Sequence, residues 1–140
     1  MGMLFYDLDF FAGFTSVNLL LMSIILFLNI KLDSKYHILS ILSIFLIGMI
    51  TESLGVNYGL IFGDYEYGDN LGFKLFGVPY LIGVNWIILT VISGNIASFI
   101  TKNTSIVLTI IIGALLMLAM DFVMEPIAPK LDMWRFKNLI

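Results

Sequence analysis

Four long stretches of the sequence carry almost no charge, and this spacing of charged residues most constrains the fold. Three of them cover residues 10–30, 75–101 and 103–120; a fourth, with only His37 near its start, covers residues 36–51 and continues past one acid. About 20 apolar residues suffice to cross the hydrocarbon core of a bilayer. We therefore predict transmembrane helices over residues 10–30, 36–54, 78–100 and 104–124.

The predicted fold is all-α, a polytopic integral membrane helix bundle that forms one domain over residues 1–140. The composition agrees, because 60% of the residues are hydrophobic and 12% are charged, whereas soluble domains are about 25% charged. These values exclude a soluble globule, a nucleic-acid-binding protein and a disordered tail. The lipid bilayer is therefore the first expected partner, and the oligomeric state stays open.

Cysteine and histidine usage limits the chemistry. The chain has no cysteine and one histidine, which excludes a disulfide framework, a thiolate metal site and a site with several histidine ligands. We predict no metal site.

Three acids lie where an apolar helix is expected: Glu52, Asp121 and Glu125. A carboxylate inside hydrocarbon costs at least ~2.5–3.5 kcal/mol, so such residues usually face the bundle interior and have a function. Asp121 and Glu125 are four residues apart and share one helix face. Like charges this close favour keeping one carboxyl protonated, as an acid able to donate a proton. Alternatively, Asp121 and Glu125 lie at the membrane interface, solvated by headgroups.

The glycine-rich segment that follows Glu52, residues 55–77, is expected to form a loop or a broken helix end. Gly55, Gly59 and Gly63 recur at four-residue spacing, a pattern that lets another helix or a flat ligand approach a helix backbone, helix packing being the simpler interpretation. The tyrosines that follow, Tyr65 and Tyr67, are typical of interfacial anchors.

Several of these motifs occur together in one known family. They are the segment Glu52–Tyr67 (ESLGVNYGLIFGDYEY), Leu71-Gly72, Gly77-Val78-Pro79, Asn85-Trp86 and Asp121-Phe122-Val123-Met124-Glu125-Pro126. In this order they resemble the membrane carotenoid biosynthesis protein family, which includes carotenoid 1,2-hydratases such as the bisanhydrobacterioruberin hydratase type. The resemblance covers about Glu52 to Trp134. Family members usually continue with further transmembrane helices, so we expect this chain to be a fragment or a shortened member of a larger bundle.

The resemblance implies a function. It implies acid-catalysed addition of water to the terminal double bond of an acyclic carotenoid, without a cofactor, in a bacterial or archaeal cytoplasmic membrane. Glu52 or Asp121 would donate the proton, and Glu125 would complete the acid cluster. The residues expected to line the polyene end are Tyr58, Gly59, Tyr65, Tyr67, Asn85 and Trp86. From the residues alone, Asn85 can instead form an interhelical hydrogen bond, and Trp86 can serve packing.

Two other functions stay open at the level of sequence. In a lycopene-cyclase-like reaction, the same protonated intermediate is trapped by an internal double bond instead of water. In the other alternative, the chain is a non-enzymatic small membrane component, such as a transporter subunit.

Overall fold

Three helices of the computed structural model, which describes residues 13–137, are long and apolar enough to cross a membrane. They are α4 (Lys35–Tyr58), α5 (Tyr80–Thr101) and α6 (Ile106–Met124). These helices lie where spans were predicted over residues 36–54, 78–100 and 104–124. Helix α4 continues four residues further than predicted, because the backbone first turns left-handed at Gly59, with φ of 64°.

The first predicted span is shorter in the structure. Helix α3 covers Thr15–Asn29, only 15 residues, whereas about 20 are needed to cross a bilayer core. The backbone becomes extended at Ile30, which ends the helix before the polar turn that follows. Residues 10–12 of the predicted span lie outside the described residues. The bundle of four helices is thus confirmed, with three of them qualifying as spans.

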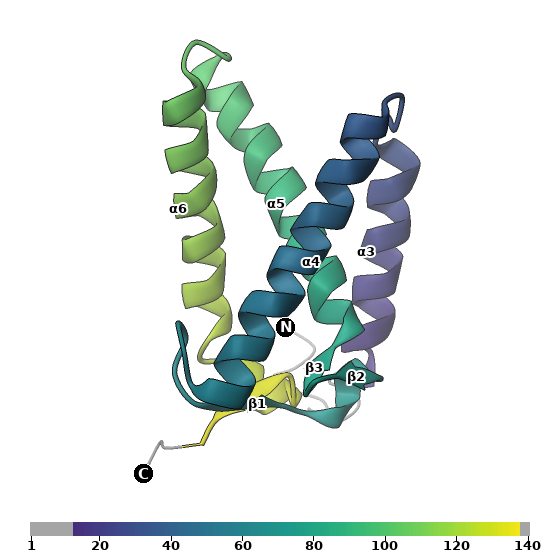
Figure 1. Ribbon diagram of the computed structural model, residues 1–140, viewed down its shortest axis with the longest axis vertical. Helices are drawn as coiled ribbons and strands as arrows, with labels where there is room; N and C mark the ends of the chain where they lie inside the picture. The colour runs from purple at the N-terminus through teal and green to yellow at the C-terminus, as the bar shows by residue number, and fades with distance from the viewer. Residues whose placement is uncertain (1–12, 138–140) are drawn as a thin grey trace, which may run out of the picture.

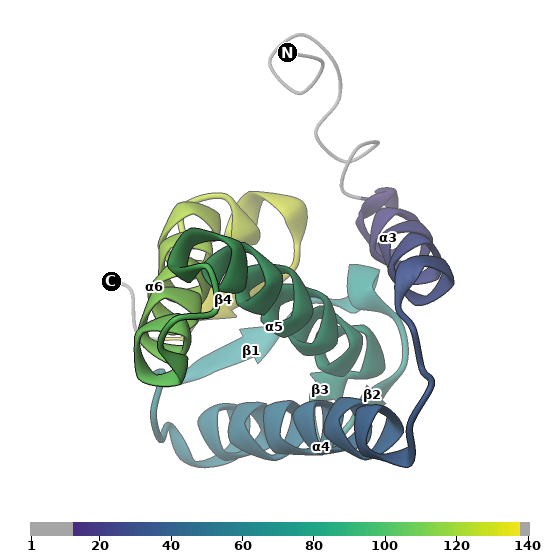
Figure 2. The same ribbon diagram turned by 90° about the horizontal axis from the view of Figure 1, so that it is seen from above.

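Helix α5 is the central helix of the bundle. It packs against α6, α4 and α3. Figure 2 shows α5 between α4 and α6, with α3 at the right of the view. Helices α4 and α6 approach each other at one end and diverge toward the turn that joins α5 to α6 (Figure 1). We call the end of the bundle where α4 and α6 approach each other the closed end.

Four short strands, which the all-α prediction missed, lie at the closed end. Strand β1 (Tyr65–Tyr67) pairs antiparallel with β4 (Trp134–Phe136), and β2 (Lys74–Leu75) pairs antiparallel with β3 (Val78–Pro79). Of two short 3₁₀ helices, η1 (Asp69–Leu71) lies between β1 and β2, and η2 (Ala128–Leu131) lies between α6 and β4. We call this end of the molecule the sheet end (Figure 1).

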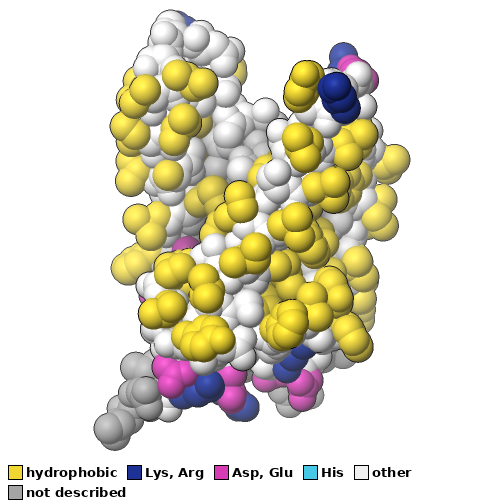
Figure 3. All heavy atoms as spheres, in the orientation of Figure 1, with side chains coloured by type: hydrophobic (Ala, Val, Ile, Leu, Met, Phe, Trp, Pro, Cys, Tyr) yellow, Lys and Arg dark blue, Asp and Glu magenta, His cyan; other side chains and the backbone are white. Residues whose placement is uncertain are grey.

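The packed core also lies at the sheet end. Its buried apolar side chains come from α4, β1, η1, β3, α5, η2 and the residue just before β4: Met49, Tyr65, Tyr67, Leu71, Val78, Ile82, Ala128, Leu131 and Met133. Helix α3 is tied to this end by the Ser16 hydroxyl, which donates to the Asn70 carbonyl oxygen. Away from it, the helices expose mainly hydrophobic side chains (Figure 3), the surface expected of a membrane protein.

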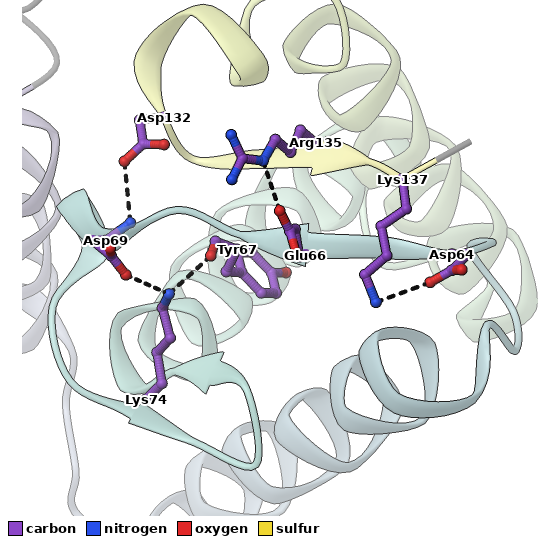
Figure 4. A network of polar contacts seen from close by, with 8 residues as sticks. All are labelled: Asp64, Glu66, Tyr67, Asp69, Lys74, Asp132, Arg135 and Lys137. Carbon is purple, nitrogen blue, oxygen red and sulfur yellow. Dashed lines mark hydrogen bonds and ion pairs between the residues drawn. The ribbon is translucent and has the colours of Figure 1, made fainter. Parts of the chain in front are cut away.

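The outer face of the β1–β4 sheet is charged. Arg135 Nε lies 2.7 Å from Glu66 Oε1, its cross-strand partner, and Lys137 Nζ lies 3.1 Å from Asp64 Oδ1 (Figure 4). A third ion pair joins Lys74 and Asp69, and Lys74 lowers the pKa of the Asp69 carboxyl by hydrogen bonding and by its charge. Exposed pairs of this kind contribute little to stability, because solvent screens their charges. Because these side chains are charged and exposed, they indicate that the sheet end faces water.

Gly68, just after β1, allows the backbone to pass close to Asp132 at the sheet end. A Cβ at this position would overlap the backbone carbonyl and the side chain of Asp132, whose carboxylate accepts a hydrogen bond from the Asp69 N–H. We expect Gly68→Ala to destabilise the protein by about 1–3 kcal/mol, because backbone atoms must shift. Thermal unfolding in detergent measures this, with Gly94→Ala as the control. Gly94 has no atom within 4 Å of a built Cβ, so equal loss of stability in both variants would contradict the prediction.

Candidate active site

A cavity of about 360 Å³ lies between α4, α5, α6 and the β1–β4 sheet. All three acids that the sequence singled out, Glu52, Asp121 and Glu125, line it. The other lining residues are mostly apolar or aromatic: Phe62, Tyr65, Ile82, Asn85, Trp86, Leu89, Ala114, Met117, Leu118, Trp134 and Phe136. The structure thus brings the predicted acids together in one mainly apolar chamber.

Helical periodicity explains which side chains reach this cavity. On α5 the lining positions are 82, 85, 86 and 89, and on α6 they are 114, 117, 118 and 121. Both sets follow the spacing i, i+3, i+4, i+7, which places residues on one face of a helix. Each helix therefore presents one continuous stripe to the chamber.

The polar groups gather at one end of the chamber. With a rise of 1.5 Å per residue, Glu52 lies ~9 Å from the end of α4 and Asp121 lies ~5 Å from the end of α6, whereas Ala114 lies ~15 Å from it. The acids are therefore close to the sheet end, and the lining farther from it is apolar. Leu118 lines the chamber yet is 63% exposed, so the chamber opens sideways, on the side where the surface is hollowed between α6 and α4 (Figure 3).

Glu52 is held by three hydrogen-bond donors. Its side chain is buried, with the residue 8% exposed. The hydroxyl groups of Tyr65 and Tyr67 donate to Oε2, the second at 2.7 Å, and the indole N–H of Trp86 donates to Oε1 at 2.9 Å. An indole N–H can only donate. Both carboxyl oxygens of Glu52 thus act as acceptors.

The two tyrosines are suited to remain donors. Burial raises the pKa of the Tyr67 hydroxyl, and the nearby charge of Glu52 raises it further. Burial also raises the pKa of Tyr65, helped by its hydrogen bond to Glu52 and, more weakly, by the charge of Asp121. Both hydroxyls therefore keep their protons at ordinary pH. Donors of this kind favour a charged carboxylate as their acceptor.

Gly55 allows Tyr65 to reach Glu52. A Cβ at Gly55 would lie 2.7 Å from the Tyr65 hydroxyl oxygen and 2.8 Å from its ring carbon Cε1. The glycine repeat, however, does not form the predicted helix face. Helix α4 ends at Tyr58, and both Gly59 and Gly63 have positive φ angles, which place them in the turn that leads into β1.

Asp121 and Glu125 differ from Glu52 in their surroundings. Both are exposed, and within residues 13–137 neither carboxyl group forms a side-chain hydrogen bond or an ion pair. Glu125 follows the last residue of α6, so it lies at the end of the helix, whereas Asp121 lies within it. The chamber therefore holds one carboxyl group with three donors and two with none among the residues described.

The residues predicted to contact the polyene fall into three groups. Tyr65, Asn85 and Trp86 line the chamber. Tyr67 binds Glu52 but is not part of the lining, and both tyrosines are too buried to serve as interfacial anchors. Tyr58, which is 73% exposed, and Gly59 lie outside the lining. Trp86, for which packing was the alternative, donates a hydrogen bond to Glu52.

The sequence analysis missed the contribution of β4. Trp134 and Phe136 line the chamber and pack edge-on against their cross-strand partners, with ring centroids 6.4 Å from Tyr67 and 6.1 Å from Tyr65. The signal that could have found this strand is the alternation of aromatic and basic residues over positions 134–137. Alternation with a period of two places one set on each face of a strand.

Tyr67 offers a test of how firmly Glu52 is held. We expect Tyr67→Phe to destabilise the protein by about 1–3 kcal/mol, because it removes a buried hydrogen bond to a charged group. Thermal unfolding in detergent measures the change. Tyr80→Phe is the matched control, since Tyr80 is exposed and stacks on Phe73 through its ring. A Tyr67→Phe variant as stable as this control would show that the hydrogen bond contributes nothing.

The fold and the chamber define a membrane protein with a carboxyl-lined apolar pocket. The family model described as carotenoid biosynthesis protein matches residues 11–139. This chain belongs to the carotenoid biosynthesis protein family, which confirms the resemblance seen in the sequence motifs and gives the chain a role in carotenoid biosynthesis. No curated protein and no solved structure matches the chain significantly.

Proposed function

We propose that this protein is an enzyme that hydrates the terminal double bond of an acyclic carotenoid end group, giving a tertiary alcohol. The observation that carries the proposal is the pairing of a donor-bound carboxyl, Glu52, with a free carboxyl, Asp121, at one end of an otherwise apolar chamber. An apolar chamber with few polar groups suits a hydrocarbon substrate. Its side opening between α4 and α6 would admit the substrate from the bilayer.

The chemistry needs an acid and a counter-charge. An alkene has no polar handle, so hydration starts with transfer of a proton to carbon 2 of the end group. The two electrons of the double bond form the new C–H bond, which leaves a tertiary cation at carbon 1. Water then adds to carbon 1 and loses one proton to a carboxylate. Proton donation by a positioned side chain typically accelerates a reaction by about 100- to 10,000-fold.

The surroundings of the acids support a division of these roles. Asp121 has no donor among the described residues to stabilise its charge, and it shares the chamber with two other carboxyls. It is therefore the proposed proton donor. Glu52, held by Tyr65, Tyr67 and Trp86, is the proposed carboxylate that stabilises the cation. A fixed charge aimed at the developing charge is among the strongest catalytic devices available to an enzyme.

The position of Glu125 favours hydration over ring closure. Glu125 is exposed, lies at the end of α6 and still lines the chamber. The neighbouring outer face of the β1–β4 sheet is charged (Figure 4). Water can therefore reach the acids from the sheet end, whereas ring closure requires a chamber that excludes it.

Expression in cells that accumulate lycopene, an acyclic carotenoid, tests the proposal. We expect pigments that have gained one water per reacted end, identified by mass, and no such gain in cells with an empty vector or with Asp121→Asn. Cyclic products without added oxygen would show that the reaction is cyclisation and not hydration. An unchanged pigment set, with the protein present in the membrane fraction, would refute an enzymatic role on acyclic ends.

A further inference from the structure

The Asn85 side chain is an unexplained polar group in the chamber. It lines the chamber on α5 beside Trp86, with the apolar residues Ile82 and Leu89 one turn away on either side. Asn85 is half-buried, and its carboxamide has no hydrogen-bond partner in the described part of the chain. Its amide atoms are not fully buried, so the carboxamide is accessible from the chamber, where hydrogen bonding to a polar ligand would satisfy it. Its presence therefore points to a polar ligand inside the chamber.

Asn85 lies at the level of the acids. It is ~8 Å from the start of α5 at the sheet end, compared with ~9 Å for Glu52 on α4 and ~5 Å for Asp121 on α6. The next lining residue of α5, Leu89, is apolar. Asn85 thus lies where the polar part of the chamber meets its apolar part, which is the level at which the carbon to be hydrated would sit.

We propose that the Asn85 carboxamide binds the water molecule that captures the carbocation, and that Asn85 thereby sets the ratio of hydrated to water-free products. This inference rests on the proposed hydration. A bound water needs two to four polar partners; the carboxamide offers a donor and an acceptor, and the carboxyl groups offer further acceptors. The Asn85 carbonyl would accept one O–H of the water and leave an oxygen lone pair free for carbon 1.

Each fate of the cation balances. With water in place, the C–O bond forms at carbon 1, and the water passes one proton to the carboxylate of Asp121, which regains the proton it gave. Without it, a C–H bond next to carbon 1 breaks, its electrons form a double bond, and the proton returns to the same carboxylate. The second fate regenerates an alkene and consumes no water. In D₂O, however, it leaves deuterium in the recovered substrate.

Deuterium therefore separates cation formation from water capture. The full chain, reconstituted in vesicles that contain lycopene, is assayed in D₂O, and both the alcohol and the deuterium in recovered lycopene are measured by mass. We expect Asn85→Leu to lower the ratio of alcohol to deuterated lycopene by about tenfold, the effect of losing the hydrogen bonds that hold one water. Ring products, if present, count with the water-free fraction.

The controls separate a specific role from a structural one. Asn95→Leu removes an exposed amide from the same helix, outside the chamber, and should keep the wild-type ratio. If Asn85→Leu does not accumulate in the membrane, the ratio of alcohol to deuterated lycopene is measured with Asn85→Ala instead. A parallel fall of alcohol and deuterium, with an unchanged ratio, would overturn the assignment of Asn85 while leaving hydration intact. Absence of alcohol with the wild-type protein would instead refute the proposed function itself.

Discussion

Replacing Asp121 with asparagine should abolish hydration, with a loss of roughly 100- to 10,000-fold, the contribution expected of a general acid. Asparagine has nearly the same shape but no acidic proton. Asp121 forms no side-chain hydrogen bond within the described chain and is exposed to the chamber, so the fold should be retained. Product mass from lycopene-accumulating cells, normalised to the protein in the membrane fraction, measures the loss.

Asp33→Asn is the matched control for this change. Asp33 is exposed and lies in the turn between α3 and α4, at the end of the bundle opposite the acids. We expect wild-type yields from it. If Asp121→Asn formed hydrated product at a rate close to that of Asp33→Asn, Asp121 would not be the proton donor. The remaining candidate would then be Glu52, which the sequence also allowed.

Replacing Glu52 with glutamine should separate its charge from its structural role. A glutamine carbonyl can accept from the Trp86 N–H, and its amide group can donate to the hydroxyls of Tyr65 and Tyr67, because a tyrosine hydroxyl can accept as well as donate. The protein should therefore fold. Activity should nevertheless fall by about 100-fold or more, because the charge that stabilises the cation is lost.

Glu52→Leu provides the structural comparison. It leaves the indole N–H and two hydroxyls without their acceptor, at about 1–3 kcal/mol for each buried group left unpaired. Thermal unfolding in detergent should show a large loss of stability for Glu52→Leu and a small one for Glu52→Gln. Glu66→Gln, on the exposed face of the sheet, should affect neither stability nor activity by much. If Glu52→Gln retained full hydration, Glu52 would be a structural residue alone.

The long helices could be predicted from the sequence because a charged side chain is costly in hydrocarbon. Long uncharged stretches located α4, α5 and α6 to within a few residues. The same cost made Glu52 and Asp121 conspicuous, and the structure places both in one chamber. Helix spacing alone then determines which neighbours of Asn85 and Asp121 face inward.

The donors to Glu52 could not be predicted in the same way. Tyr65 and Tyr67 reach it only because the chain reverses at Gly59 and Gly63 and pairs with a strand far away in the sequence. The alternation of aromatic and charged residues can mark β1 and β4 as strands, but it does not reveal that they pair with each other, because the stability of such short strands comes from partners and burial. The glycine repeat was interpreted as a helix face, because spacing does not reveal which glycine ends the helix.

The pairing of β1 with β4 has a consequence for how the protein is made. Tyr65 pairs with Phe136 and Tyr67 with Trp134, so one wall of the chamber is synthesised only after all four helices. Until β4 is synthesised, Tyr65 and Tyr67 lack the aromatic rings that pack against them. The wall of the chamber that β1 and β4 form is therefore the last to be completed in the order of synthesis.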